Sequence, residues 1–127
     1  MKIFFTLLII ALFSSTGCAQ STGTIEAAQF DKLIKEKKGL QLIDVRTAQE
    51  FKEGHIKGAV NIDYYKSDFK QLMAKLDKSK PIAVYCTVGG RSGAGAKIVQ
   101  QLGFKEVYDL EGGIVLWQRN GYKLVKE

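Results

Sequence analysis

The feature that most constrains the fold is a regular alternation between short apolar runs and segments with helical periodicity. Residues 40–45 (LQLIDV) and 82–85 (IAVY) have strand length, and residues 58–62 and 106–110 are two further strand candidates. Between these runs, apolar residues recur every three or four positions, as on one face of a helix. Strands that alternate with helices predict an α/β domain with a mainly parallel central sheet and helices on both faces.

The helical segments carry recognisable start and stop signals. Thr47 is a good N-cap for a short helix that ends before Gly54, and Ser67 is the expected cap of a later one. Further helices are expected from about residue 27 to the stop signal at Gly39, from about residue 92 to Gly103, and over residues 114–119 with Trp117 packed inward. No internal repeat interrupts this order.

Residues 84–93 (VYCTVGGRSG) raise the main chemical question. Cys86 directly follows a strand candidate, and open α/β sheets bind ligands at the carboxyl ends of their strands. Gly89 and Gly90 permit the positive φ angles that turn successive N–H groups toward an anion. Arg91 adds a permanent cation with a forked set of donors.

A helix expected to begin near Ser92 would add its N-terminus to this loop. The loop amides, the Arg91 guanidinium and the helix N-terminus would all favour the thiolate form of Cys86 over the thiol. The alternative is a buried, inert cysteine at the end of a strand, which is common for this residue type. The Gly-Gly-Arg-Ser run after Cys86 favours the nucleophile.

The first 20 residues have the layout of an export signal. Lys2 precedes an 11-residue, largely apolar run (residues 3–13), and small residues follow before Cys18. A membrane-spanning helix needs about 20 apolar residues, so this run is too short to be one. The segment resembles a bacterial lipoprotein signal, which implies that Cys18 becomes the lipidated N-terminus. The alternative is an ordinary signal cut after Ala19. The predicted organisation is a signal at 1–17, a tether at 18–23 and a domain at 24–127.

Composition narrows the chemistry further. The chain has only two cysteines, so a lipid on Cys18 would leave Cys86 without an intramolecular disulfide or resolving partner. With His55 as the single histidine and no cluster of ligand residues, neither a metal site nor a cofactor is expected. Lys and Arg outnumber Asp and Glu by 19 to 13, but the lysines are scattered. This favours a solvated basic surface over a nucleic-acid-binding face.

Three stretches together identify a family resemblance. Residues 42–62 (LIDVRTAQEFKEGHIKGAVNI), 84–104 (VYCTVGGRSGAGAKIVQQLGF) and 107–122 (VYDLEGGIVLWQRNGY) resemble the single-domain rhodanese (sulfurtransferase) family, in the family's order. The resemblance implies a rhodanese-like three-layer domain with a central, mainly parallel five-stranded sheet. It also implies an active-site loop that begins at a cysteine which becomes a persulfide.

Site roles follow from the resemblance. Cys86 corresponds to the sulfur-accepting nucleophile, and the substrate-binding loop comprises Thr87, Val88, Gly89, Gly90, Arg91 and Ser92. Asp44 and Arg46 correspond to an Asp-x-Arg motif in which a structural ion pair is expected. His55 lies in a Gly-His-Ile-x-Gly-Ala signature, where a hydrogen-bonded structural role is expected rather than that of a general base.

Loop length separates related enzymes. Tyrosine phosphatases, rhodanese-fold cell-cycle phosphatases and arsenate reductases have Cys-x5-Arg, whereas this chain has four residues between Cys86 and Arg91. The shorter loop favours a terminal sulfur over a tetrahedral oxyanion. Arg91 is the one cation of the loop, so thiosulfate would be attracted, but hydropersulfide donors or a sulfur-supplying protein are equally compatible.

The sequence therefore predicts a sulfurtransferase of the cell envelope or periplasm, held at the membrane by a lipid. It would move sulfur from thiosulfate or a persulfide donor to a thiol or to cyanide. A non-catalytic or sulfur-relay binding module of the same fold is the alternative.

Overall fold

The computed structural model describes residues 23–126, which form one central sheet with helices on both faces. The predicted signal, Cys18 and most of the predicted tether lie outside the described residues. The elements are β1 (Gly23–Ile25), α1 (Ala27–Glu36), β2 (Gln41–Asp44), α2 (Ala48–Glu53), β3 (Val60–Asn61), α3 (Phe69–Ala74), β4 (Ile82–Tyr85), α4 (Gly90–Gln101), β5 (Val107–Leu110) and α5 (Gly113–Arg119).

The five strands pair in parallel in the order β1-β5-β4-β2-β3. Every residue of β4 and β5 is buried, which explains why IAVY has no polar position. A strand covered on both faces needs apolar side chains on each. The expected α/β architecture with a parallel five-stranded sheet is confirmed.

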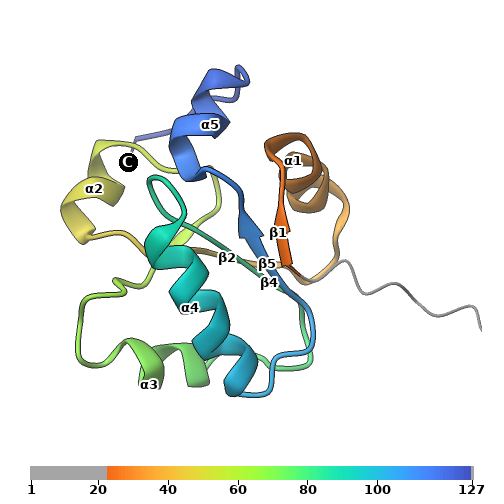
Figure 1. The fold of residues 1–127 in the computed structure, drawn as a ribbon, viewed down its shortest axis with the longest axis vertical. Coiled ribbons are helices and arrows are strands. Elements are labelled where there is room, and N and C mark those ends of the chain that lie inside the picture. Colours follow the sequence, from red (N-terminus) through yellow and green to blue (C-terminus); the bar gives the residue numbers. More distant parts are fainter. Residues whose placement is uncertain (1–22, 127) are drawn as a thin grey trace, which may run out of the picture.

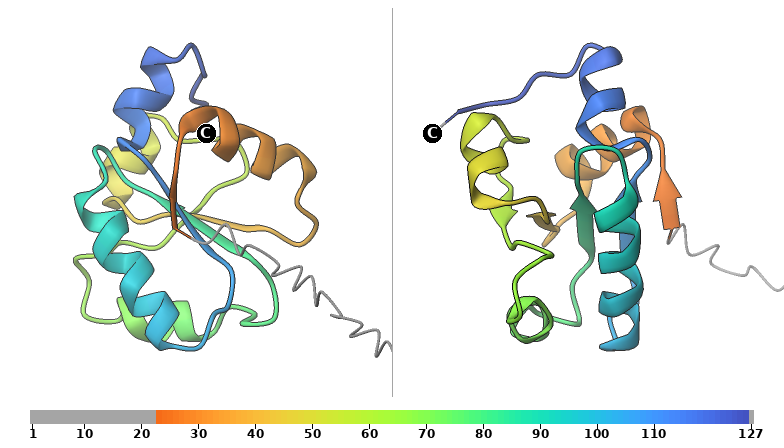
Figure 2. Two further views of the ribbon diagram at one scale, coloured as in Figure 1. Left: turned by 45° about the vertical axis from the view of Figure 1, so that its right-hand side comes forward. Right: turned by 60° about the vertical axis from the view of Figure 1, so that its left-hand side comes forward.

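Each face of the sheet has its own apolar core. On one face α3 and α4 lie side by side and cover Val84 and Val107, with Met73 and Val99 fully buried between helix and sheet (Figure 1). On the other face α1 and α5 meet, and the ring of Phe30 packs edge-on against Trp117 with centroids 6.1 Å apart. Figure 2 shows the same two pairs of helices from two further directions.

Three local expectations were wrong. β1 begins at Gly23, inside the predicted tether, because pairing with β5 rather than apolar periodicity makes this segment a strand. Asp68, not Ser67, is the N-cap residue of α3, and it makes no side-chain capping bond. α4 begins at Gly90, two residues earlier than expected.

The start of α2 is built as the sequence predicts. Thr47 caps the helix, and its side chain and that of Glu50 form a reciprocal capping box. The Thr47 hydroxyl accepts a hydrogen bond from the Glu50 amide at 3.3 Å, while the Glu50 carboxylate accepts one from the Thr47 amide at 3.2 Å. The capping box therefore orients Glu50.

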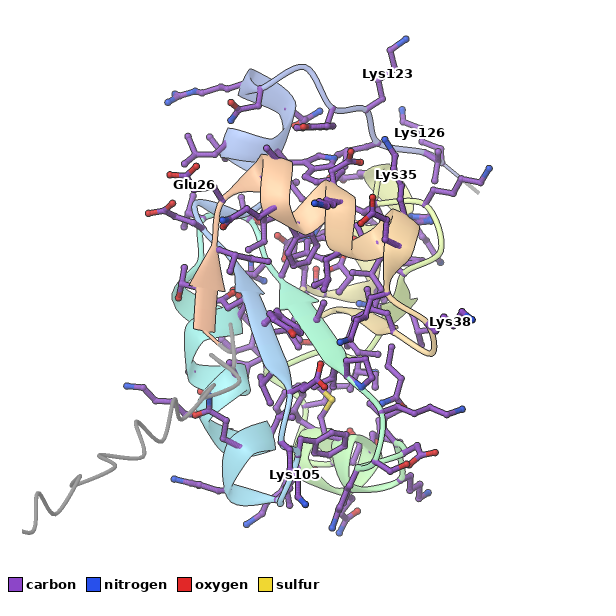
Figure 3. All side chains as sticks on the ribbon, turned by 90° about the vertical axis from the view of Figure 1, so that its right-hand side faces the viewer. Glu26, Lys35, Lys38, Lys105, Lys123 and Lys126 are labelled. Atoms are coloured by element: carbon purple, nitrogen blue, oxygen red, sulfur yellow. The ribbon has the colours of Figure 1, made fainter. Side chains whose placement is uncertain are left out.

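The basic surface is dispersed. Figure 3 shows five labelled lysines spread along one side of the molecule, from α1, two connecting segments and the C-terminal segment: Lys35, Lys38, Lys105, Lys123 and Lys126. Lys35 is paired with Asp31 at 2.8 Å. Among residues 23–126, no helix has the length and apolar character needed to cross a bilayer.

Candidate active site

Cys86 follows β4 directly and is 1% exposed. Its Sγ accepts hydrogen bonds from the amides of Gly89, at 3.1 Å, and Ser92, at 3.4 Å. The Ser92 hydroxyl lies 3.4 Å from the same sulfur. Gly89 has φ of +110°, a conformation that suits glycine and turns its amide back toward the sulfur. The Cys86 thiol donates to the Ser92 hydroxyl, which in turn donates to the Gly89 carbonyl oxygen at 3.4 Å. The donors to Sγ are therefore the two loop amides, which stabilise negative charge on sulfur.

The first turn of α5 supports this loop from behind. The amides of Ile114 and Val115 donate to the carbonyl oxygens of Cys86, at 3.0 Å, and Thr87, at 3.2 Å. Gly113 makes this close approach possible: a Cβ there would lie 2.4 Å from the Thr87 carbonyl oxygen, and its φ is +57°. The Cys86 and Thr87 carbonyl oxygens therefore bond to α5, while the Gly89 and Ser92 amides point toward the Cys86 sulfur. Figure 1 shows the loop between β4 and α4 next to α2 and α5.

Glu50 of α2 binds the other end of the loop. Arg91 donates to both carboxylate oxygens of Glu50, through Nη1 at 2.7 Å and Nη2 at 2.9 Å. The Thr87 hydroxyl donates to Glu50 Oε2 at 3.0 Å and accepts from Arg91 Nη2 at 3.2 Å. One carboxylate therefore joins the first and last side chains of the loop.

The charges of this pair stabilise each other. The Arg91 guanidinium, helped by the amide and hydroxyl of Thr47 and the hydroxyl of Thr87, holds the pKa of Glu50 well below its usual range. Glu50 in turn raises the pKa of Arg91. Both groups are therefore ionised at neutral pH, and their charges cancel at this point of the site.

A pocket of about 390 Å³ opens over the loop. It is lined by Tyr64, Tyr65, Cys86, Val88, Gly90, Arg91 and Ala94. Val88 is 67% exposed and Tyr65 is 68% exposed, so both side chains stand at the rim. The Arg91 guanidinium lies over the Tyr65 ring, 5.4 Å from its centroid. The entrance to Cys86 is therefore mainly aromatic and aliphatic.

Asp44 and Arg46 form a buried ion pair after β2. Arg46 Nη2 lies 2.8 Å from Asp44 Oδ2, and its Nε donates to Asp44 Oδ1 at 3.0 Å. The same Nη2 donates to the carbonyl of Gly54 at 2.6 Å, at the end of α2. Neither side chain lines the pocket over Cys86. The geometry fits the structural role expected for the pair.

His55 is fully buried and away from the pocket over Cys86. Its Nδ1 lies 2.9 Å from the carbonyl oxygen of Phe51, which can only accept, so Nδ1 carries the proton. The imidazole stacks on the Phe51 ring with centroids 3.8 Å apart, and the backbone of His55 pairs with that of Val125. These contacts hold α2 against the C-terminal segment and favour a structural role.

Of the predicted loop residues, Gly89 and Ser92 contact the Cys86 sulfur, whereas the side chains of Thr87 and Arg91 bind Glu50. The structure also adds residues that the sequence did not indicate. Glu50 is the most important, and its capping box was the only local sign of it. Tyr64 and Tyr65 were likewise missed. Asp109 of β5 is also buried, beside the first turn of α4. Its Oδ1 has no hydrogen-bond partner among the described residues. Burial raises the pKa of this carboxyl. Residues 23–126 contain no group of three or more His, Cys, Asp or Glu side chains arranged to hold a metal ion.

Comparison with known proteins agrees with this geometry. Residues 26–120 match the family described as "Rhodanese-like domain". The chain is 43% identical over 77 residues to the uncharacterized protein YqhL of Bacillus subtilis, covering 61% of this chain and 60% of YqhL. It therefore spans less than two thirds of YqhL. The thiosulfate sulfurtransferase GlpE of Pseudomonas aeruginosa is 40% identical over 81 residues, covering 63% of this chain and 71% of GlpE.

Among solved structures, a rhodanese-related protein from Thermoplasma volcanium superposes with a TM-score of 0.72 at 35% identity. The superposition covers 82% of this chain and 98% of that one. The family match covers well over half of the chain, and the sheet, the loop and the cysteine stand where the three sequence stretches placed them. This chain belongs to the rhodanese-like family.

Proposed function

We propose that this protein is a sulfurtransferase that carries sulfane sulfur on Cys86. The observation that carries the proposal is the surrounding of Cys86 Sγ by the Gly89 and Ser92 amides and the Ser92 hydroxyl. Similarity to GlpE, which is named a thiosulfate sulfurtransferase, supports the same reaction class.

In the first half-reaction the Cys86 thiolate attacks the outer sulfur of a donor. With thiosulfate, the S–S bond of the donor breaks, its electron pair leaves on sulfite, and Cys86 is left as a persulfide anion. The loop amides and the N-terminus of α4 then stabilise that anion, and α5 holds the start of the loop through the Cys86 and Thr87 carbonyl oxygens.

In the second half-reaction a nucleophile, such as a thiolate or cyanide, attacks the outer sulfur of the persulfide. The S–S bond to Cys86 breaks and its electron pair returns to Sγ. The transfer is therefore divided into two displacements through a covalent intermediate. The mouth of the pocket is open at Val88 and Tyr65, which gives the acceptor access to the outer sulfur.

Intact-mass measurement tests this proposal. The purified protein, incubated with thiosulfate or a polysulfide, should gain the mass of one sulfur and lose it on addition of cyanide. Cys86→Ser should gain none, and Arg119→Ala, on the exposed end of α5, should behave as wild type. If the wild-type protein takes up sulfur from no donor, the non-catalytic binding module is the better account.

The same proposal places the domain at the cell envelope through a lipid on Cys18. It rests on the sequence of residues 1–18 alone. Palmitate labelling of growing cells should tag the wild-type protein and not Cys18→Ala. Label that persists in Cys18→Ala would contradict the lipid anchor without affecting the chemistry proposed for Cys86.

A further inference from the structure

We infer that Glu50 determines which sulfur donors this site accepts, an inference that rests on the proposed function. By neutralising Arg91, Glu50 disfavours dianionic donors such as thiosulfate. The favoured class is an organic persulfide, R–S–SH, whose R group is uncharged and apolar.

The first step concerns the charge of the pocket. Among the residues that line it, Arg91 is the one cation. Three hydrogen bonds of that guanidinium go to Glu50 and Thr87, out of the five that an arginine can donate. Because Glu50 cancels the positive charge, an approaching anion meets the loop amides but no net cation. A dianion gains least from such a site, since it must also approach the Cys86 thiolate.

The second step concerns the position of the pair. The side chain of Arg91 is 18% exposed and lines the pocket, whereas that of Glu50 is 31% exposed and lies behind the guanidinium, outside the pocket lining. The capping box and the Thr87 hydroxyl both hold the carboxylate in place. Glu50 is therefore a positioning residue whose fixed charge acts on the pocket through Arg91.

The third step concerns the rim. Tyr64, Tyr65 and Val88 present aromatic and aliphatic surface beside Cys86, and Tyr65 and Val88 are more than half exposed. Such a surface favours the organic part of a persulfide, and its polar side-chain groups are the two tyrosine hydroxyls. Charge and surface therefore point to the same donor class.

The transfer from such a donor balances without a further reactant. Cys86 Sγ bonds to the terminal sulfur of R–S–SH, the donor S–S bond breaks, and its electron pair leaves on R–S⁻. The proton remains on the transferred sulfur until solvent removes it. No net oxidation or reduction occurs.

Alkylation of Cys86 measures the charge of the site without any sulfur transfer. Iodoacetate is an anion and iodoacetamide is its neutral analogue. Both react with the same thiolate, so the ratio of their rates at one pH does not depend on the fraction ionised. In Glu50→Gln the ratio of the iodoacetate rate to the iodoacetamide rate should rise about tenfold, and this increase should be smaller at high ionic strength.

Two control variants separate charge from structure. Glu50→Asp keeps the carboxylate and should return the ratio toward wild type. Glu53→Gln removes an exposed charge from the same helix and should leave it unchanged. Glutamine also serves in a capping box, so Glu50→Gln keeps the start of α2.

Donor preference is then measured as the ratio of kcat/KM for thiosulfate to that for an uncharged alkyl persulfide. Wild type should prefer the persulfide, and Glu50→Gln should raise the ratio about tenfold. If Glu50→Gln changes neither the alkylation ratio nor the donor ratio, the inference is wrong while the sulfurtransferase proposal stands. If wild type accepts sulfur from no donor, the proposed function fails, and the alkylation ratio still decides whether Glu50 sets the charge of the site.

Discussion

Two arginine–carboxylate pairs involve helix α2 or its ends, and they differ in burial and in the sequence separation of their partners. Asp44 and Arg46 are two residues apart, and their side chains are 0% and 4% exposed. Glu50 and Arg91 are 41 residues apart, and their side chains are 31% and 18% exposed. Both pairs are bidentate, so their geometry alone does not distinguish them.

Because the two pairs differ in burial and in sequence separation, we expect them to have different roles. In the Asp44–Arg46 pair each buried side chain neutralises the charge of the other. Arg46 also bonds to the Gly54 carbonyl oxygen and so connects the end of β2 to the end of α2. The Glu50–Arg91 pair joins α2 to the loop after β4, at a surface that a substrate can reach. We therefore expect removal of the first pair to reduce stability and removal of the second to change reactivity.

The largest effect is expected for Arg46→Ala. Removing one partner of a buried pair leaves an unpaired buried charge, which costs about 3–5 kcal/mol of the free energy of unfolding. Urea unfolding measures this loss. Arg119→Ala, at an exposed arginine, should change the value by less than about 0.5 kcal/mol. If Arg46→Ala lowers the free energy of unfolding by less than about 1 kcal/mol, the buried pair is not the more stabilising of the two.

Arg91→Met should show the opposite profile. A partly exposed pair contributes only about 1 kcal/mol or less, so the free energy of unfolding should fall little. Uptake of sulfur from thiosulfate should slow at least about tenfold, because Glu50 is left as an uncompensated negative charge beside the pocket. Sulfur uptake followed by intact mass measures the rate.

A double variant sharpens this prediction. Glu50→Gln combined with Arg91→Met removes both charges, and its iodoacetate-to-iodoacetamide ratio should lie closer to wild type than either single variant. A double variant whose ratio stays as far from wild type as that of either single variant would contradict a paired charge.

Asp109 offers a third carboxyl for comparison, because burial raises its pKa whereas Arg91 lowers that of Glu50. With a folded pKa above the ordinary 3.8, stability is full below that value and is lost as pH rises through the folded pKa. Asp109→Asn cannot ionise, so it should be more stable than wild type at neutral pH. Unfolding between pH 3.5 and 8 tests this: the advantage should disappear at the acid end, and a constant difference would contradict it.

The smallest effect is expected for the stability of Glu50→Gln. The pKa of Glu50 lies below its ordinary 4.5, so its contribution is present above that pH and is lost as pH falls through the lowered pKa. Glu50→Gln should therefore be less stable than wild type by about 1 kcal/mol or less at neutral pH. The two unfolding curves should converge on acidification. If the two variants still differ in the free energy of unfolding at low pH, the loss of stability in Glu50→Gln comes from packing rather than from charge.

The sequence predicted what is encoded locally. The apolar run of β4, the cysteine after it and the glycines of the loop are contiguous, so the position of Cys86 at the carboxyl end of a strand could be read directly. The cap at Thr47 was equally local. Glu50 could not be assigned to the site because its partner is 41 residues away. Its spacing from Thr47 distinguishes it from Glu53 only as a member of a capping box.

β1 was missed for a related reason. Gly23, Thr24 and Ile25 have no strand periodicity of their own, and they become a strand because β5 presents a free edge to them. Arg91 was expected to be the cation of an anion site, and its pairing with Glu50 was not expected. In each case a contact between distant segments decided the role of the residue.

The parallel direction of the sheet also decides which way the reactive sulfur faces. The described chain enters the sheet at Gly23, the amino end of β1, whereas Cys86 follows the carboxyl end of β4. Parallel strands place these two points at opposite edges of one sheet. A domain held by the residues before Gly23 would therefore present its sulfur on the side away from the point of attachment, where donors and acceptors arrive from solution.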